Sequence, residues 1–361
     1  MSADACYPKG LLPVDAAIAQ LIALARAVSP VAETVPLAEA AGRVLAADVV
    51  AGFNVPPEAN SAMDGIAFCH ADLPAPAALP LSQRIPAGTA PSPLEPGTAA
   101  RIFTGAVLPA GADTVAMQEN CEFSGEQVRV LAVPAAGANV RPAGQDLAAG
   151  SVVLRRGQRL SPPALGLLAS LGQPSVSVFR RLRVAVLSTG DELLEPGEPW
   201  RPAAIYNSNR PMLAALLAGW GLGVIDLGRV ADSQAATEAA LAAALAAGAD
   251  VIVSSGGVSV GEEDHVKAAL LARGRLDFWK IALKPGKPVA VGEVRGDAGA
   301  VPFIGLPGNP QSVFVTALLL ARPFLLARQG QADVLPAMFQ LPAAFARRGG
   351  DRREYLRVRR E

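Results

Sequence analysis

A regular alternation of apolar strands and helices between Leu182 and Leu320 constrains the fold more than any other feature of this sequence. The predicted strands are 183–187, 223–230, 250–254, 276–283 and 302–305, and the predicted helices are 210–219, 233–247, 264–272 and 310–320. Alternation at this spacing predicts a mostly parallel α/β sheet covered by helices. Ligands of such sheets bind beyond the carboxyl ends of the strands, so the loops that follow the strands are the first candidates for a site.

Polar residues before two of these helices suggest how they begin. Asp232 is the expected N-cap of the helix 233–247, and the run 207–209 (Asn-Ser-Asn) is expected to cap the helix 210–219. Both assignments rest on side-chain oxygens that can accept hydrogen bonds from the unpaired N–H groups of a first helical turn.

The chain from 50 to 150 has a different texture. Pro and Gly recur every few residues, and the apolar runs 99–103, 114–117 and 127–133 are short, which predicts an all-β module. Predicted helices at 14–28 and 162–171 flank it, so we interpret the module as an insertion in a small helical domain. The roughly 30 residues after the last α/β helix are few for a domain, and we expect an incomplete C-terminal β module.

Composition excludes several classes of protein. Lys plus Arg and Asp plus Glu both number 32, so the chain has no bulk attraction for nucleic acid or an anionic membrane. We find neither a secretory leader nor about 18 uninterrupted apolar residues, and expect a soluble, cytoplasmic protein. Three scattered cysteines and two histidines argue against a zinc site or a Ser–His–Asp triad. Catalysis would then rest on carboxylates, lysines, backbone amides and a hard metal ion held by oxygens.

Three loops after predicted strands carry candidate ligand groups. The loop 188–192 (Ser-Thr-Gly-Asp-Glu) suits ligand contact and suits a structural turn equally. In the loop 254–264, three glycines let backbone N–H groups approach an anion, and Asp264 either caps the next helix or holds Mg²⁺. The turn 306–312 places Pro310 in a first helical turn, where free amides and the helix dipole suit an oxyanion.

Lysine is rare in this chain, yet three of its five lysines lie between positions 280 and 287. Lys280 and Lys284 are four residues apart, so in one strand they would share a face. Lys287 follows a Pro-Gly turn. Three neighbouring cations repel one another unless an anion neutralises them, which favours an anionic ligand over a merely solvated loop. The β module adds the turns 60–65, 102–106 and 141–146, each of which is ordinary on its own.

Taken together, these loops resemble the molybdenum cofactor enzymes of the MoeA type and the E domain of gephyrin. The matching strings are 61–65 (SAMDG), 104–105 (TG), 188–192 (STGDE), 255–259 (SGGVS), 284–288 (KPGKP) and 306–310 (LPGNP). They occur in the family's order along nearly the whole chain. Ile66 stands where that family often has Tyr.

The resemblance implies a multidomain α/β plus β fold with four domains. These would be a split helical linker domain (1–48 and 147–181), an inserted β-rich domain (49–146), a MogA-like molybdopterin-binding α/β domain (182–331), and the truncated start of a C-terminal β domain (332–361). It also implies a homodimer whose site lies between the β insertion of one subunit and the α/β domain of the other. The implied substrates are adenylated molybdopterin and molybdate, the cofactor is Mg²⁺, and molybdopterin adenylyltransferase is a possible partner.

Functional positions carry over by matching strings. The implied catalytic residues are Asp64, Thr104, Asp146, Glu192, Asp232, Asp264, Lys280 and Lys284. The implied substrate-binding residues are Thr189, Gly190, Ser255, Gly256, Gly257, Ser259, Pro307, Gly308, Asn309 and Pro310. Asp232 and Asp264 would hold Mg²⁺, whereas Lys284, Lys287 and Ser312 would place molybdate. Two alternatives stay open: a molybdopterin adenylyltransferase, which shares the α/β domain, and a scaffold without catalysis, as gephyrin is for receptors.

Overall fold

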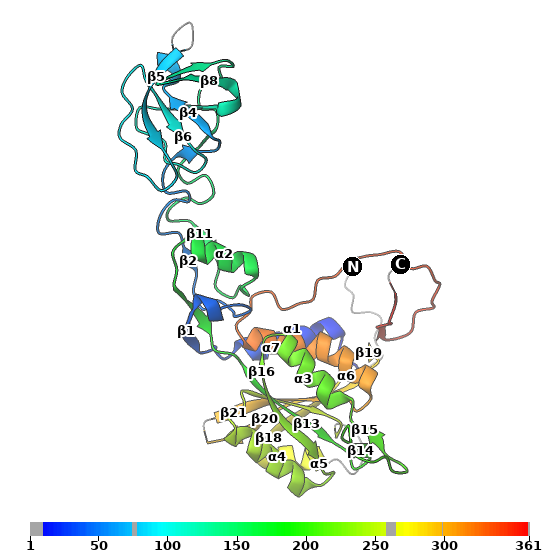
Figure 1. Cartoon of the computed structure of the whole chain (residues 1–361). Coiled ribbons are helices and arrows are strands. Elements are labelled where there is room, and N and C mark those ends of the chain that lie inside the picture. Colours follow the sequence, from blue (N-terminus) through cyan, green and yellow to red (C-terminus); the bar gives the residue numbers. More distant parts are fainter. Residues whose placement is uncertain (1–9, 74–77, 258–264, 298, 360–361) are drawn as a thin grey trace. The chain divides into compact units, whose positions relative to one another are not determined.

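The computed structural model describes residues 10–73, 78–257, 265–297 and 299–359 (Figure 1). The chain forms two compact units. Unit 1 is Met1–Ala47 with Arg156–Ser161 and Ser175–Glu361, and unit 2 is Asp48–Arg155 with Pro162–Pro174. Unit 1 contains the predicted α/β part and unit 2 the predicted β-rich part, which confirms the expected fold class. The four predicted domain boundaries stay a prediction.

Unit 1 is built around a six-stranded sheet in the order β16-β13-β17-β21-β20-β18. Its strands are β13 (Arg183–Thr189), β16 (Gly223–Val230), β17 (Val251–Ser255), β18 (Gly274–Lys280), β20 (Pro288–Gly296) and β21 (Gly299–Leu306). The four strands β16, β13, β17 and β21 pair in parallel, and β20 runs antiparallel to both β21 and β18. β20 is absent from the strands predicted from the sequence, because its pairing with the strand on either side is set by tertiary contacts.

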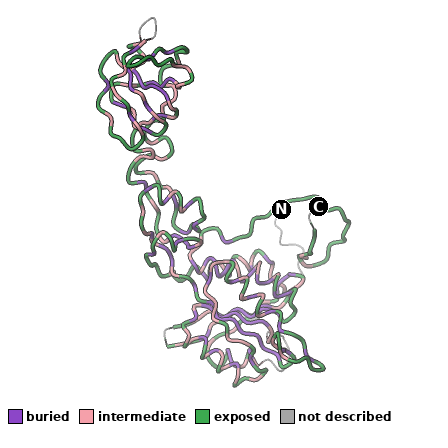
Figure 2. The backbone as a smooth tube through the Cα atoms, in the orientation of Figure 1, coloured by how far each residue is buried: buried purple, intermediate pink, exposed green. Residues whose placement is uncertain are grey.

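Helices cover both faces of this sheet (Figure 1). They are α1 (Val14–Arg26), α3 (Asn209–Gly219), α6 (Pro310–Thr316) and α7 (Arg322–Arg328) on one face, and α4 (Gln234–Ala246) and α5 (His265–Arg273) on the other. Short elements complete the unit: β1 (Ala32–Pro36), η2 (Leu37–Glu39), β12 (Ser175–Phe179), β14 (Leu193–Leu194), β15 (Ile205–Tyr206), β19 (Leu283–Lys284), η5 (Ala317–Ala321) and β22 (Arg353–Glu354). The central strands are buried because both of their faces are covered (Figure 2).

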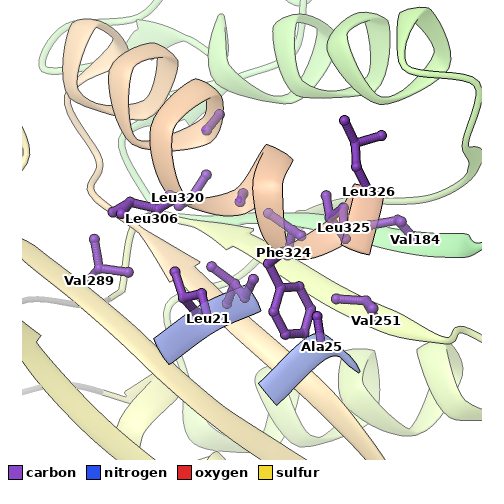
Figure 3. Packing of buried hydrophobic residues seen from close by; sticks show 14 of the residues in the cluster. Leu21, Ala25, Val184, Val251, Val289, Leu306, Leu320, Phe324, Leu325 and Leu326 are labelled. Atoms are coloured by element: carbon purple, nitrogen blue, oxygen red, sulfur yellow. The ribbon is translucent and has the colours of Figure 1, made fainter. Parts of the chain in front are cut away.

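The apolar periodicity of α1 is what docks it on the sheet. Val14, Ala17, Leu21 and Ala25 recur at helical spacing and are all fully buried. They pack with Phe324 of α7 and with the strands beneath (Figure 3). The N-terminal helix predicted from this spacing is therefore confirmed, and it ends within two residues of the expected point.

One helical run in the described residues meets the length and composition of a membrane span. It is Pro310–Arg328, which joins α6, the π-helical η5 and α7, and it has a mean hydropathy of 1.4. Within this run, 61% of the most apolar 18-residue stretch is buried inside the protein. Its apolar surface is therefore largely occupied by the α/β core.

The predicted cap is wrong at the start of α4 and confirmed at the start of α3. The N-cap of α4 is Ser233, whose hydroxyl accepts a hydrogen bond from the Ala236 N–H, so the assignment of Asp232 as the cap is wrong. At α3 the side chain of Ser208 makes no capping hydrogen bond, but Asn207, which belongs to the predicted capping run 207–209, accepts the Arg210 N–H through Oδ1. At α4 the role passes to a neighbouring polar residue of the same capping class.

Unit 2 contains a second six-stranded sheet, in the order β7-β4-β6-β5-β9-β8. Its strands are β4 (Gly65–Phe68), β5 (Ala78–Ile85), β6 (Ala99–Ile102), β7 (Thr114–Met117), β8 (Cys121–Ser124) and β9 (Gln127–Val130). Smaller elements of the unit are β2 (Val49–Val50), β3 (Asn60–Ser61), η3 (His70–Asp72), η4 (Gln118–Asn120), β10 (Val140–Arg141), β11 (Val152–Leu154) and α2 (Pro162–Ser170). Two apolar clusters, one around Phe68 and one around Ile102, form its core.

We expect Leu21→Ala to lower the free energy of unfolding of unit 1 by about 2–5 kcal/mol, because it leaves a cavity under α1. Leu24→Ala is the matched control on the same helix, where the side chain is 46% exposed, and it should change stability by less than about 0.5 kcal/mol. All three tryptophans, Trp200, Trp220 and Trp279, lie in unit 1, so their fluorescence during urea denaturation follows this unit. Equal effects of the two substitutions would show that α1 does not contribute to the core.

Candidate functional site

A cavity of about 620 Å³ opens at the carboxyl ends of β13, β17 and β21. Its walls come from the three loops that follow these strands and from the start of α3. Every predicted substrate-binding residue except Ser259 lines it, and so do Glu192 and Asp232. Ser259 and Asp264 lie outside the described residues. The structure thus brings together three loops that are far apart in the sequence.

The register of the parallel strands explains why these loops meet. Ser188 of β13 pairs with Ser255 of β17, and Ser255 pairs with Leu306 of β21. The buried hydroxyls of Ser188 and Ser255 lie 2.8 Å apart and are hydrogen bonded. The residue after each of these positions therefore lies at the same level of the sheet and lines the cavity: Thr189, which ends β13, and Gly256 and Pro307, which follow β17 and β21.

The glycine loop lies too close to its neighbours for side chains. Gly256 and Gly257 have φ values of +85° and +64°, in the left-handed region that favours glycine. A Cβ on Gly257 would come 2.3 Å from Val266 Cγ2 and 2.7 Å from Thr189 Oγ1, and a Cβ on Gly256 would come 2.7 Å from the Thr189 carbonyl oxygen. The loop therefore presents bare backbone to the cavity, which is the surface that phosphate-binding loops use.

Polar groups without partners lie in the same wall. The Thr189 hydroxyl is buried and makes no hydrogen bond with the described residues. Asn209 donates from Nδ2 to the Gly308 carbonyl oxygen at 2.8 Å, while its buried Oδ1 has no partner there. Since a carbonyl oxygen can only accept, this contact fixes which end of the Asn209 amide is which. Unsatisfied buried groups are costly, and they mark this wall as built for a polar ligand.

Asn207 and Asn209 are cavity residues that the sequence reasoning missed. Both belong to the Asn-Ser-Asn run, which was interpreted only as a helix cap. Leu193, Ile205, Tyr206, Ser208 and Pro288 also line the cavity. A second asparagine beyond the one that caps α3 was the available signal, because one cap needs only one such side chain.

The start of α6 is already capped. Asn309 Oδ1 accepts the N–H groups of Gln311 and Ser312 at 3.0 and 3.3 Å, and Pro310 occupies the first turn. The free amides expected from the sequence are therefore engaged by a neighbouring side chain. An oxyanion at this helix end would have to displace Asn309 or share these donors with it.

Two carboxylates face the cavity without ion pairs among the described residues. They are Glu192 and Asp232, both solvent accessible. The backbone of Asp232 is held by a hydrogen bond from its N–H to Asp191 Oδ1 at 3.0 Å. Because Ser233 caps α4, the Asp232 carboxylate is not needed at that helix. Oxygen donors of this kind suit Mg²⁺, although the described residues contain no group of three metal-ligating side chains.

The lysine cluster is arranged differently from the prediction. Lys280 ends β18 and Lys284 belongs to β19, with two residues between the strands, so the expectation that both share a face of one strand is wrong. The cause is a change of pairing partner between residues 280 and 283. β18 pairs with β20, whereas β19 pairs in parallel with β22 near the C-terminus. Lys280 and Lys287 are exposed.

The turn after Lys284 packs against α6. A Cβ on Gly286 would come 2.6 Å from Thr316 Cγ2 and 3.7 Å from the Ser312 carbonyl oxygen. Pro288, at the end of this turn, lines the cavity. The segment that carries Lys284 and Lys287 therefore leads from the side of α6 to the cavity wall.

The remaining predicted residues, Asp64, Thr104 and Asp146, lie in unit 2. Asp64 Oδ1 accepts hydrogen bonds from the Thr104 N–H at 2.8 Å and the Thr104 hydroxyl at 2.7 Å. These two bonds, the backbone one first, lower the pKa of Asp64, and the nearby Arg101 charge acts in the same direction. Asp146 is exposed on another loop of the unit. Asp64 and Thr104 are thus a local pair, fixed in geometry and ionised near neutral pH.

Comparison with known proteins gives a consistent result. Residues 12–172 match the MoeA N-terminal region (domain I and II), and residues 185–327 match a probable molybdopterin binding domain. A molybdopterin molybdenumtransferase of Haemophilus influenzae is 43% identical over 83% of this chain and 73% of its own length. Molybdopterin molybdenumtransferase 2 of Mycobacterium tuberculosis is 41% identical over 85% of this chain and 77% of its own. The crystal structure of a molybdopterin biosynthesis MoeA protein from Pyrococcus horikoshii matches with a TM-score of 0.74 at 30% identity, over 89% of this chain and 79% of that one.

We expect Gly257→Ala to destabilise unit 1 by about 1–3 kcal/mol, because the added methyl group meets Val266 and Thr189. Gly308→Ala in the same cavity is the control, since its Cβ would meet only Gly256 Cα, at 3.8 Å. Urea denaturation followed by tryptophan fluorescence measures both variants. A Gly257→Ala protein as stable as Gly308→Ala would mean that the loop is not packed as described.

Proposed function

The chain belongs to the molybdopterin molybdenumtransferase (MoeA) family, and from this premise we propose that it inserts molybdate into adenylated molybdopterin and releases AMP in an Mg²⁺-dependent reaction. The observation that carries the proposal is the cavity at the ends of β13, β17 and β21. There, bare glycine backbone, two carboxylates without ion pairs in the described part of the chain, and the turn 284–288 that carries Lys284 and Lys287 adjoin one another. A cytoplasmic location is part of the proposal.

The cavity offers a different surface to each part of an adenylated pterin. The backbone of Gly256 and Gly257 can approach phosphate oxygens closely, and the adjacent turn from Pro307 to Pro310 continues the same lining. The amide of Asn209 and the hydroxyl of Thr189 supply unused hydrogen-bonding capacity for the pterin. These residues bind and orient the substrate, so their contribution to the rate is positional.

The donor set fits a hard cation. Asp232 and Glu192 line the cavity and would supply carboxylate oxygens to Mg²⁺. The resemblance to the family adds Asp264, which lies outside the described residues, as a second ligand beside Asp232. When bound, Mg²⁺ would stabilise negative charge on the phosphate of the departing AMP. The chain's own groups do the rest: Lys284, Lys287 and Ser312 attract and place the molybdate dianion beside the substrate.

The proposal includes a homodimer with sites shared between subunits, as the resemblance to the family implies. Asp64, Thr104 and Asp146 would then come from one subunit, and Glu192, Asp232 and the lysines from its partner. Delivery of substrate by a molybdopterin adenylyltransferase is a compatible partner reaction. A second enzyme class, the adenylyltransferase itself, consumes ATP, and a scaffold consumes nothing.

One assay separates these functions. The protein is incubated with adenylated molybdopterin, Mg²⁺ and molybdate, and AMP is measured; AMP release that needs both ions is the expected result. Consumption of ATP with free molybdopterin, or no turnover at all, would reject the proposal.

The same assay tests the oxyanion site at Lys284. Losing one charge-assisted hydrogen bond, worth roughly 1.5–3 kcal/mol, should raise the molybdate KM of Lys284→Ala about 10- to 100-fold. Binding of adenylated molybdopterin should be unchanged. Lys284→Arg should rescue poorly, because the larger, planar guanidinium cannot place its donors where the compact ammonium places them. An unchanged molybdate KM in Lys284→Ala would remove this lysine from the reaction.

A mixed dimer tests the shared site. Asp64→Ala alters unit 2 and Glu192→Ala alters unit 1, and each should abolish activity when present in both subunits. Co-assembled heterodimers would carry one site with both substitutions and one with neither, so about half the normal activity per heterodimer should return. Heterodimers that stay inactive would count against sharing between subunits.

A further inference from the structure

The C-terminal strand β22 lies against the strand that carries Lys284. Its Arg353 N–H donates to the Ala282 carbonyl oxygen and its neighbour Tyr355 donates to the Lys284 carbonyl oxygen, both at 2.9 Å. The strands are parallel, with Lys284 opposite Glu354. The backbone of the lysine strand is therefore held by a segment about 70 residues further along the chain.

A side-chain ion pair follows from this register. Lys284 Nζ lies 2.7 Å from Glu354 Oε1, and the other carboxylate oxygen of Glu354 lies 2.6 Å from Arg347 Nη2. The Glu354 side chain is only 16% exposed, whereas those of Lys284 and Arg347 are about half exposed at 52% and 49%. Hydrogen bonds from Lys284 and then Arg347 lower the pKa of Glu354, so the carboxylate is charged throughout the neutral range.

The strand itself is anchored separately. Arg353 forms a two-bond ion pair with Asp15 of α1, at 2.7 and 2.8 Å, and Tyr355 packs against the core of unit 1. β22 therefore has anchors in unit 1 that do not involve Glu354. Glu354 itself contacts one cation on the neighbouring strand, Lys284, and one on its own segment, Arg347.

We propose that Glu354 is a positioning residue that fixes the Lys284 ammonium for oxyanion binding and tempers its charge, an inference that rests on the proposed role of Lys284. An ammonium has three N–H donors, and the contact with Glu354 uses one, which leaves two for a tetrahedral oxyanion. The carboxylate also repels that anion, and Arg347 offsets part of this repulsion. Glu354 therefore lowers the affinity of Lys284 for the oxyanion somewhat, while it fixes the position of the ammonium group.

Two substitutions separate position from charge. Glu354→Gln removes the negative charge but keeps an oxygen that can accept from Lys284, with Arg347 free to turn to solvent. Glu354→Ala removes both charge and acceptor. Sodium molybdate binding to the full chain, measured by calorimetry, should be about two- to fivefold tighter in Glu354→Gln than in the unaltered protein, the scale of an exposed charge pair. Glu354→Ala should bind about two- to tenfold more weakly than Glu354→Gln, because its lysine must be immobilised on binding.

The matched control is Asp15→Asn, which weakens the anchor of β22 and leaves the charges beside Lys284 unchanged. It should bind molybdate as the unaltered protein does. A merely structural Glu354 would instead make all three variants weaken binding alike. Acylation of Lys284, followed by mass spectrometry, gives a second readout: the lysine should react faster in Glu354→Ala than in Asp15→Asn.

The outcomes are distinguishable from those of the proposed function. Equal affinity of Glu354→Gln and Glu354→Ala, weaker binding by Glu354→Gln than by the unaltered protein, or no molybdate binding at all overturns the positioning role. If the expected order of affinities appears but no AMP is released, the positioning role stands and the proposed reaction fails. If AMP is released but Glu354→Gln and Glu354→Ala bind molybdate with equal affinity, the proposed reaction stands and the positioning role fails.

Discussion

The parallel register of β13, β17 and β21 is the constraint on which the candidate site depends. Ser188, Ser255 and Leu306 lie side by side in the ladder, so three loops leave the sheet at one level. The fully buried Val186, Val253 and Ile304 hold that register, because a slip of one residue in a strand would move its side chain out of the cluster that these three share and into the differently packed cluster on the other face. The packing in the middle of the strands thus also fixes the relative positions of the loops at their ends.

The features of the fold and the site that the sequence predicts are local ones. The ends of β13, β17 and β21 and the Pro310 helix start depend on residues within a few positions of each other, and the structure has them within two residues of the expected points. The arrangement of Lys280 and Lys284 does not depend on local residues, because β18 pairs with β20 and β19 pairs with β22. No periodicity within 276–284 records a partner that lies 70 residues away. Tertiary pairing overrides the local pattern here.

Capping shows the same limit at a smaller scale. Asp232 and Ser233 belong to one class of N-cap residue, and only the backbone conformation decides between them. The choice has a functional consequence. With Ser233 at the cap, the Asp232 carboxylate turns to the cavity, where it has no partner among the described residues. The Asp232 carboxylate would have been used as the N-cap if α4 began one residue earlier. With Ser233 in that role, it is available to a ligand.

The formal net charge of the chain is zero, so its affinity for an anion depends on the charged and polar groups near the binding site. At the start of α6, Asn309 satisfies amides that an anion would otherwise attract, and at β19, Glu354 holds an ammonium that would otherwise be mobile. Both groups can yield to a stronger ligand without leaving a buried donor unpaired. A site built this way is ordered before its substrate arrives, so less of the binding free energy is lost to fixing side chains. The cost is weaker attraction for any single anion, which suits a site that must also let its product leave.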